Sequence, residues 1–179
     1  MTSKTKQTGR AATLVLAGVL ALASLPASAV VAERAENPWL EHRVMNMPHS
    51  GGEDEAPTNT MYAFERALRK GGDMIELDVQ STRDDRLVVL HNATVDASTN
   101  GTGRVEDLTW RQVRRLDAAH WFIRGRSHSD HDARRSAYEL RGARYGDVRV
   151  RGHQPRDFGI PLLRQVFRAF PDTLSLIHI

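Results

Sequence analysis

Two acidic residues and a histidine attract attention because they interrupt or end apolar runs. Glu76 and Asp78 stand one residue apart inside the run Met74–Val79, and His91 follows the run Leu87–Leu90. Side chains alternate between the two faces of a strand, so Glu76 and Asp78 would share one face. Two carboxylates so placed repel each other, and a hard divalent cation such as Mg²⁺ or Ca²⁺ would remove that repulsion. The residues alone leave another interpretation open, in which both acids face solvent on an edge strand or pair with arginines.

Two histidines are candidates for proton transfer at the same site. His91 would end a strand at the edge where parallel α/β folds carry their functional groups. His49 lies in the loop His49–Gly52, after a short strand predicted at Arg43–Met47, which would be the same edge. Imidazole titrates near neutral pH, so a pair of histidines can supply a general base and a general acid. Each could equally be a structural or an ordinary loop histidine.

Apolar residues at helical spacing predict three helices around these residues. The first would take Asn59 or Thr60 as its N-cap and would end before Gly71. The second is expected within residues 107–117. The third would carry Pro161 in its first turn, where the missing N–H of proline is tolerated.

Apolar runs between the helices predict strands. The segments DMIELDV (residues 73–79) and LVVLH (residues 87–91) flank a turn, and residues 171–174 would lead into a further strand. Residues 120–159 are rich in Arg, Ser, Asp, His and Gly, and we expect a long, partly irregular polar insertion on the surface. The order of strands and helices indicates an α/β fold with parallel strands.

The composition excludes several classes of site. The chain has no cysteine, which excludes disulfides, thiolate metal ligands and cysteine nucleophiles. Lys4, Lys6 and Arg10 account for the whole formal net charge of +3, so the rest of the chain gives no argument for nucleic-acid binding. The stretch HSDHD (His128–Asp132) is expected to belong to the solvated insertion rather than to a metal cluster.

The spacing of the motifs resembles that of the glycerophosphodiester phosphodiesterase family. HSGG at His49, PTNT at Pro57, ELD at Glu76 and HN at His91 correspond in that family to a His-Arg-Gly loop, a Pro-Glu-Asn-Thr helix start, a Glu-x-Asp strand and a His-Asp pair. The resemblance implies a TIM-barrel-like (β/α)8 fold, which typically needs ~250 residues. We therefore expect residues 43–173 to form a partial barrel, roughly the N-terminal half.

The resemblance also implies an activity, the metal-dependent hydrolysis of glycerophosphodiesters to glycerol 3-phosphate and an alcohol. The implied cofactor is a divalent metal ion, Mg²⁺ or Ca²⁺, and the implied partner is a small glycerophosphodiester. By position, the resemblance implies that Glu76 and Asp78 are metal ligands and that His49 and His91 are the acid–base groups. Ser50 and Asn59 are the implied substrate-binding residues.

Three positions depart from the family pattern and keep other functions open. Ser50 stands where the family has Arg, so a phosphate-binding guanidinium is missing there. Thr58 replaces Glu, and Asn92 replaces Asp. Ser50 and Thr58 favour one alternative, a secreted non-catalytic protein of the same fold that binds phosphodiesters or lipid headgroups. A phospholipase D-like relative that cyclises lipids is the other.

Both ends of the chain carry sequence that we do not assign to the barrel. Residues 1–29 combine a basic start, an apolar stretch and ASA, which is typical of a cleaved secretory signal peptide. We therefore expect a secreted protein without a membrane span after cleavage, and a polar lead-in at residues 30–42. The tail LSLIHI (residues 174–179) resembles the translation of a transposon-end sequencing adapter. If it is artefactual, the family's strand with the third carboxylate ligand is missing after Thr173 and the fragment is inactive; the alternative is a genuine strand ending in His178.

Overall fold

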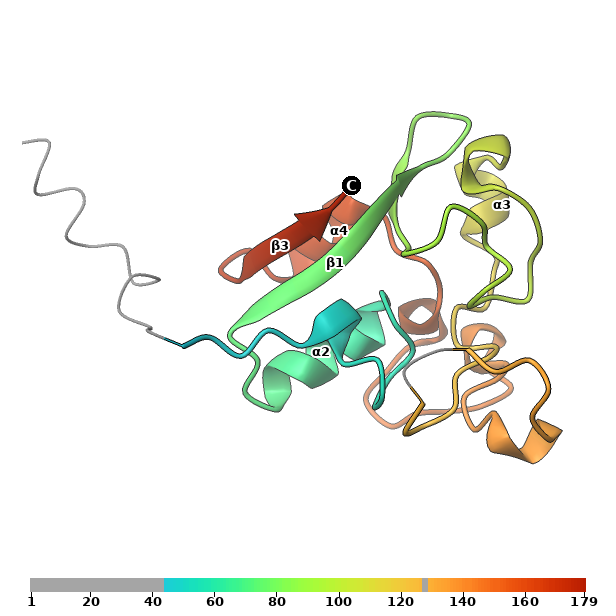
Figure 1. Cartoon of the computed structure of the whole chain (residues 1–179), viewed down its shortest axis with the longest axis horizontal. Helices are drawn as coiled ribbons and strands as arrows, with labels where there is room; N and C mark the ends of the chain where they lie inside the picture. The colour runs from blue at the N-terminus through green and yellow to red at the C-terminus, as the bar shows by residue number, and fades with distance from the viewer. Residues whose placement is uncertain (1–43, 127–128) are drawn as a thin grey trace, which may run out of the picture. The chain divides into compact units, whose positions relative to one another are not determined.

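The computed structural model describes residues 44–126 and 129–179. The predicted signal peptide (residues 1–29) and lead-in (residues 30–42) lie outside the described residues. No helix in the described part is long and apolar enough to cross a membrane. The helices, with 3-10 helices written η, and the strands follow the chain in this order (Figure 1): η2 His49–Gly51, α2 Met61–Arg69, β1 Met74–Ser81, β2 Leu87–Val89, η3 Val105–Asp107, α3 Trp110–Val113, η4 Arg135–Ala137, η5 Ala143–Tyr145, η6 Pro155–Phe158, α4 Leu163–Ala169 and β3 Leu174–His178.

The three strands form one sheet in the order β2–β1–β3 (Figure 1). β3 runs parallel to β1, with Met74 opposite Leu174 and Asp78 opposite His178. β2 runs antiparallel to β1, so the prediction of parallel strands is confirmed for β3 and wrong for β2. The turn between β1 and β2 is too short for a parallel crossover, which needs a dozen or more residues.

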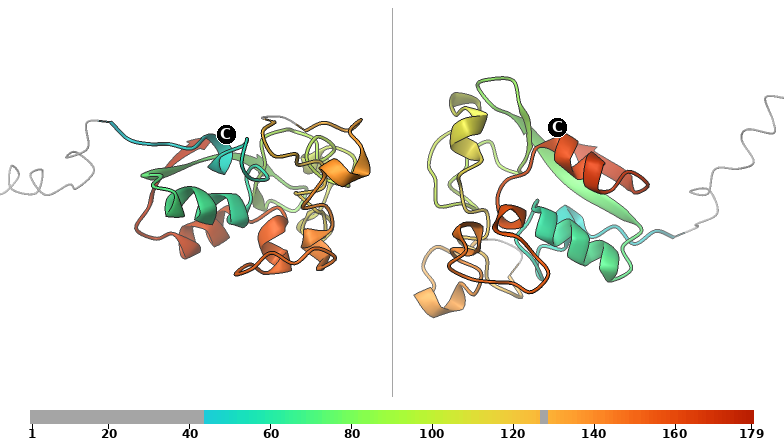
Figure 2. Two further views of the ribbon diagram at one scale, coloured as in Figure 1. Left: turned by 90° about the horizontal axis from the view of Figure 1, so that it is seen from below. Right: turned by 180° about the vertical axis from the view of Figure 1, so that it is seen from behind.

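The central strand β1 separates an apolar layer from a polar one. Ile75, Leu77 and Val79 pack on one face against Phe64 of α2 and Val166 of α4, and all five side chains are buried. Both helices lie in front of the sheet when the molecule is seen from behind (Figure 2, right). The opposite face carries Glu76 and Asp78, which the segment before α2 covers.

Two further clusters of buried side chains complete the core. One joins β2 to the segments that follow it, through Val88, Val95, Val113 and Ile160 among others. The second packs Tyr62 and Ala63 of α2 against side chains from residues 120–159: Phe122, Leu140, Ala143 and Phe158. Residues 120–159 contain no α-helix or strand where the structure describes them, yet they supply half of this cluster.

Local hydrogen bonds explain where α2, α3 and α4 begin and end. Thr60 is the N-cap of α2, because its side chain accepts a hydrogen bond from the N–H of Ala63. α3 is shorter than predicted, since the N–H groups of Arg115 and Leu116 donate to carbonyls three residues back, those of Gln112 and Val113, and not four residues back. α4 begins after Pro161 rather than with it, and the Pro161 carbonyl accepts from the N–H of Val89 (2.9 Å).

Two predicted strands differ from the structure. Residues 44–47 of the predicted strand Arg43–Met47 form no strand, and Arg43 lies outside the described residues. The backbone of Asn46 bonds only to Asp73, just before β1, so no ladder develops. β2 ends at Val89 rather than at His91, since the carbonyl of His91 accepts from the side chain of Gln80 (3.0 Å) and not from the backbone of β1.

Candidate active site

Glu76 and Asp78 form the buried acidic part of the site. Only 3 % and 8 % of these residues is exposed, and they lie on the central strand. The interpretation that they face solvent on an edge strand is therefore wrong. No arginine in the described ranges pairs with either carboxylate. Their donors come instead from Ser50 and Asn59.

Ser50 contacts both carboxylates. Its backbone N–H donates to Oε2 of Glu76 at close range, and its Oγ lies 3.3 Å from Oδ2 of Asp78. Its backbone adopts φ 49° and ψ 26°, in the left-handed region, which costs a non-glycine residue roughly 1–2 kcal/mol. A hydrogen bond to a charged group contributes about 1.5–3 kcal/mol and can offset that cost.

Asn59 holds Asp78 from two sides. Its Nδ2 donates to Oδ2 of Asp78 (2.9 Å), and its Oδ1 accepts from the backbone N–H of Asp78 (3.2 Å). Nδ2 also lies 3.3 Å from Oγ of Ser50. Asn59 is buried and has φ 58°, a conformation that asparagine tolerates better than most residues. The substrate-binding residues predicted at 50 and 59 thus directly contact the predicted metal ligands.

His49 and His91 line one pocket of about 520 Å³. The side chain of His49 is 57 % exposed, and its Nδ1 lies 3.3 Å from Oε2 of Glu53. His91 is exposed, and its Nδ1 contacts the side chain of Asn92. Ser50 and Thr58 also line the pocket, so Ser50 connects it to the buried carboxylates. The acid–base roles of the two histidines stay predictions.

The two carboxylates fit a hard divalent cation. They are buried on one face, and their hydrogen bonds come from the neutral groups of Ser50 and Asn59, so no basic side chain from these neighbours offsets their charge. One ligand atom from each of Glu76, Asp78 and His178 lies within 4.8 Å of the others. The ring of His178 is 60 % exposed and its Nε2 lies 3.4 Å from Oε1 of Glu76, so the fit rests mainly on the two buried carboxylates, whose oxygens suit Mg²⁺ or Ca²⁺.

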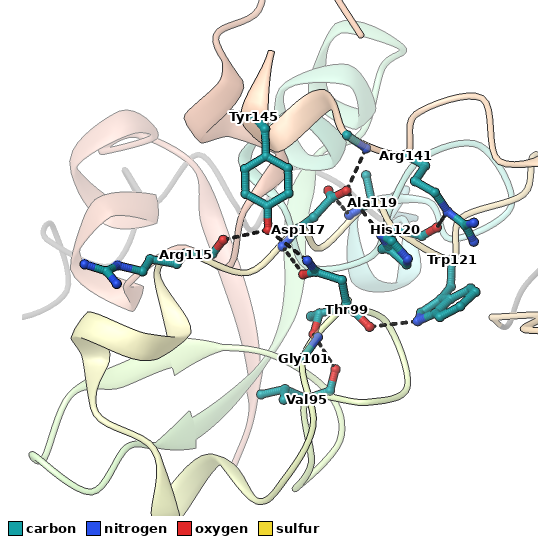
Figure 3. Close-up of polar contacts among 12 residues, drawn as sticks. Val95, Thr99, Gly101, Arg115, Asp117, Ala119, His120, Trp121, Arg141 and Tyr145 are labelled. Carbon is teal, nitrogen blue, oxygen red and sulfur yellow. Dashed lines mark hydrogen bonds and ion pairs between the residues drawn. The ribbon is translucent and has the colours of Figure 1, made fainter. Parts of the chain in front are cut away.

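A polar cluster around Asp117, which the sequence analysis did not single out, lies next to the pocket residue Ala118, and Figure 3 shows its hydrogen bonds. The Asp117 carboxylate is fully buried and accepts from the N–H groups of Ala119 (3.1 Å) and Gly142 (2.8 Å). The indole N–H of Trp121 donates to the carbonyl of Thr99 (2.7 Å). The one signal in the sequence is an acid within the apolar stretch LDAA. These bonds hold the two segments that carry the pocket residues Ala97 and Ala118.

His120 lies at the edge of this polar cluster, with its Nδ1 3.7 Å from Oδ2 of Asp117. Burial lowers the pKa of His120 below its usual value, and the nearby guanidinium of Arg141 lowers it further. His120 is therefore neutral over a wider pH range than an exposed histidine.

The stretch HSDHD contributes protein contacts where the structure describes it, and His128 lies outside the described residues. Asp130 pairs with Arg126. The ring of His131 stacks on Trp121 with centroids 4.3 Å apart, and its Nε2 lies 3.1 Å from the carbonyl of Ala97. Both Arg126 and His131 line the pocket, although the sequence analysis did not propose either as a site residue.

These features define an α/β enzyme-like fold with a carboxylate pair and a histidine pair around one pocket. Comparison with known proteins identifies its family. Residues 49–178 match the glycerophosphoryl diester phosphodiesterase family, and the chain belongs to that family.

Curated relatives support the same assignment over part of their length. The chain is 47 % identical over 76 residues to a glycerophosphodiester phosphodiesterase of Caldanaerobacter subterraneus, a match that covers 42 % of this chain and 31 % of the relative. It is 36 % identical over 103 residues to a glycerophosphodiester phosphodiesterase of Bacillus subtilis, covering 58 % and 35 %. The chain therefore spans about a third of the length of these relatives.

Solved structures show the fold. A glycerophosphoryl diester phosphodiesterase domain from Mycobacterium tuberculosis matches with a TM-score of 0.55 and 25 % identity, over 74 % of this chain and 42 % of the other. A glycerophosphodiester phosphodiesterase from Agrobacterium tumefaciens matches with a TM-score of 0.53 and 27 % identity, over 75 % and 46 %. The fold is that of the TIM-barrel enzymes of this family, here as a partial sheet with its helices.

Proposed function

We propose that the protein hydrolyses glycerophosphodiesters to glycerol 3-phosphate and an alcohol. The observation that carries the proposal is that His49 and His91 line the same pocket. Ser50, which also lines it, bonds to the buried carboxylates of Glu76 and Asp78. The chain spans about a third of its curated relatives, so the proposal concerns the full-length protein.

The two histidines would move the protons of the reaction. One imidazole takes a proton from a water molecule as the water oxygen forms a bond to phosphorus. The other donates a proton to the alkoxide that leaves as the second phosphorus–oxygen bond breaks.

Glu76 and Asp78 would hold a divalent metal ion, whose chemistry is to offset the phosphate charge and polarise the phosphoryl oxygen. Ser50 and Asn59 fix the orientation of the two carboxylates before any ligand arrives. Such a preorganised arrangement lowers the cost of reorganisation during the reaction. The proposal does not distinguish Mg²⁺ from Ca²⁺.

An assay of phosphodiester cleavage tests the proposal. The full-length protein encoded at this locus and the segment Val30–Thr173 are each incubated with a glycerophosphodiester, with and without chelator, and released glycerol 3-phosphate is measured. We expect chelator-sensitive release by the full-length protein and little or none by the segment. Glu76→Gln should abolish release, whereas Glu106→Gln, an exposed acid paired with Arg104, should leave it intact. Release that persists with chelator would remove the metal role of Glu76 and Asp78.

Ser50 and Thr58 favour a second candidate, a non-catalytic protein that binds phosphodiesters or lipid headgroups. Both line the pocket, and neither side chain carries a charge there. The double substitution Ser50→Arg and Thr58→Glu separates the candidates: a silent full-length protein that gains hydrolysis would favour the binding function. A cyclic phosphate among the products would instead indicate the phospholipase D-like reaction.

We also propose secretion through the signal-like segment at residues 1–29. Its support is the basic, apolar and small-residue layout of that segment. Expression of the full-length protein in a bacterial host, followed by fractionation, would test this. Retention of uncleaved protein in the membrane fraction would contradict it.

A further inference from the structure

One side of the pocket is formed by residues 122–126, and hydrogen bonds join these residues to the segment between η2 and α2. The N–H of Gly125 donates to the carbonyl of Asp54 (2.6 Å). The Nη1 of Arg124 lies 3.4 Å from the carbonyl of Glu55. These bonds bring Arg126 to the pocket that His49 and His91 line. The backbone is thus held beside the pocket at Gly125, one residue before Arg126.

Arg126 is the one permanent cation among the described residues that line the pocket. The permanent anion among them, Glu53, is engaged with His49 at 3.3 Å. Arg126 is paired with Asp130 through its Nη1. A guanidinium has five N–H donors in a planar fork, so this pair orients the group and leaves other donors for a ligand.

The alternative is that Arg126 and Asp130 form an ordinary surface ion pair with no role in ligand binding. The Arg126 side chain is 50 % exposed and pairs with a residue four positions later. Exposed pairs of this kind contribute little to stability and affect no ligand. The place of Arg126 on the pocket argues for more, because a phosphodiester is an anion and planar guanidinium forks suit phosphate oxygens.

We propose that Arg126 is a substrate-binding residue that contacts the non-bridging oxygens of the reacting phosphate. The proposal rests on the function proposed above. It assigns the phosphate-binding cation to residues 122–126, which are hydrogen-bonded to Asp54 and Glu55. Ser50, which carries no charge, cannot supply such a cation from its own position on the pocket.

Direct binding of phosphate compounds tests the proposal without depending on catalysis. Inorganic phosphate, sn-glycerol 3-phosphate and glycerol are titrated by calorimetry into the full chain, with and without Mg²⁺. Arg126→Ala should weaken binding of both phosphate compounds about tenfold, since a tenfold change corresponds to about 1.4 kcal/mol. Arg126→Lys should lose less. Arg156→Ala, whose side chain is 83 % exposed and lies off this pocket, should bind like the unchanged chain.

The outcomes separate this proposal from the proposed hydrolysis. If the full-length protein hydrolyses its substrate and Arg126→Ala keeps the same KM, the role of Arg126 is wrong and the hydrolysis stands. If no hydrolysis occurs but phosphate binding falls in Arg126→Ala alone, the phosphate site stands and the hydrolysis fails. Absence of phosphate binding by the unchanged chain would overturn the role of Arg126. A loss confined to substrates with an anionic alcohol would overturn it too, because Arg126 would then contact the leaving group.

Discussion

The two buried carboxylates of this molecule, Glu76 and Asp78, accept hydrogen bonds from one asparagine and one serine. Asn59 satisfies both the side chain and the backbone of Asp78, and Ser50 satisfies Glu76 through its backbone. The donors are neutral, so they stabilise the carboxylates without cancelling their charge. A buried pair of this kind is costly in the absence of a cation, which makes its stability sensitive to any further charge nearby.

Replacing Asn59 by Asp tests that sensitivity. The substitution keeps the shape of the side chain but places a third carboxylate where Nδ2 now donates to Asp78 (2.9 Å). We expect a loss of about 3 kcal/mol in the free energy of unfolding at neutral pH. Millimolar Mg²⁺ or Ca²⁺ should recover part of it, because a ligand that binds the folded state stabilises it. Urea unfolding measures both effects.

A matched variant controls for the added charge. Asn92→Asp introduces the same group at an exposed position, where we expect a change within about 0.5 kcal/mol. A loss in Asn59→Asp that no divalent cation relieves would contradict a metal site at Glu76 and Asp78.

His120 should make stability depend on pH. Its pKa is lowered below 6.5, first by burial and second by Arg141. The folded chain therefore binds fewer protons at this residue than the unfolded chain as pH falls below 6.5. The stabilisation that the neutral ring provides is present above 6.5 and is lost as pH falls toward the folded pKa.

NMR titration of the imidazole and urea unfolding on both sides of pH 6.5 measure this dependence. His120→Gln should unfold with a shallower loss of stability in that pH window. A titration midpoint for His120 at or above 6.5 would show that the prediction is wrong.

The elements differ in how far the sequence alone could predict them. α2 was predictable, because Thr60, the apolar spacing and Gly71 all point to the same helix. The direction of β2 was not recognised, since an apolar run looks alike in either direction and only the short turn decides it. The burial within residues 120–159 depends on a few side chains, such as Phe122 and Phe158, that meet α2 from far along the chain.

The candidate site shows the same division. Alternation along β1 predicted that Glu76 and Asp78 share a face, and that face is buried. The hydrogen bond from Ser50 to Glu76 could not be predicted, because it depends on a left-handed backbone conformation. The position of Arg126 could not be predicted, because it depends on a backbone bond from Gly125 to Asp54 that leaves no pattern in the sequence.

The loop before α2 offers a test at the scale of one element. Gly51 and Gly52 both have positive φ, at 84° and 90°, but only Gly51 is crowded. A Cβ on Gly51 would lie 2.8 Å from Cβ of Ala63 in α2, whereas a Cβ on Gly52 meets nothing within 4 Å. Gly52→Ala should therefore cost only the left-handed conformation, about 1–2 kcal/mol. Gly51→Ala adds overpacking of about 1–3 kcal/mol.

Thermal or urea unfolding of the two variants measures the difference. The loop also carries His49 and Ser50, so Gly51→Ala should also weaken phosphate binding, and Gly52→Ala should weaken it less. Equal stability of the two variants would show that α2 can move away from the loop at little cost.

The three apolar clusters of the molecule are joined by neighbouring residues in the chain. In β2, Val88 belongs to one cluster and Val89 to the next. In α2, Ala63 and Phe64 point into two different clusters. Consecutive residues that pack into different clusters make it difficult for one cluster to melt while its neighbour stays intact.

We therefore expect residues 44–179 to unfold as one cooperative unit. Phe64→Ala and Phe158→Ala remove fully buried rings from different clusters, and each should lower the free energy of unfolding by about 3–5 kcal/mol. Both should shift a single transition that fluorescence and circular dichroism report at the same denaturant concentration. If Phe158→Ala instead split the transition in two, residues 120–159 would fold as a separable unit, and the pocket wall with Arg126 could open while β1 keeps its structure.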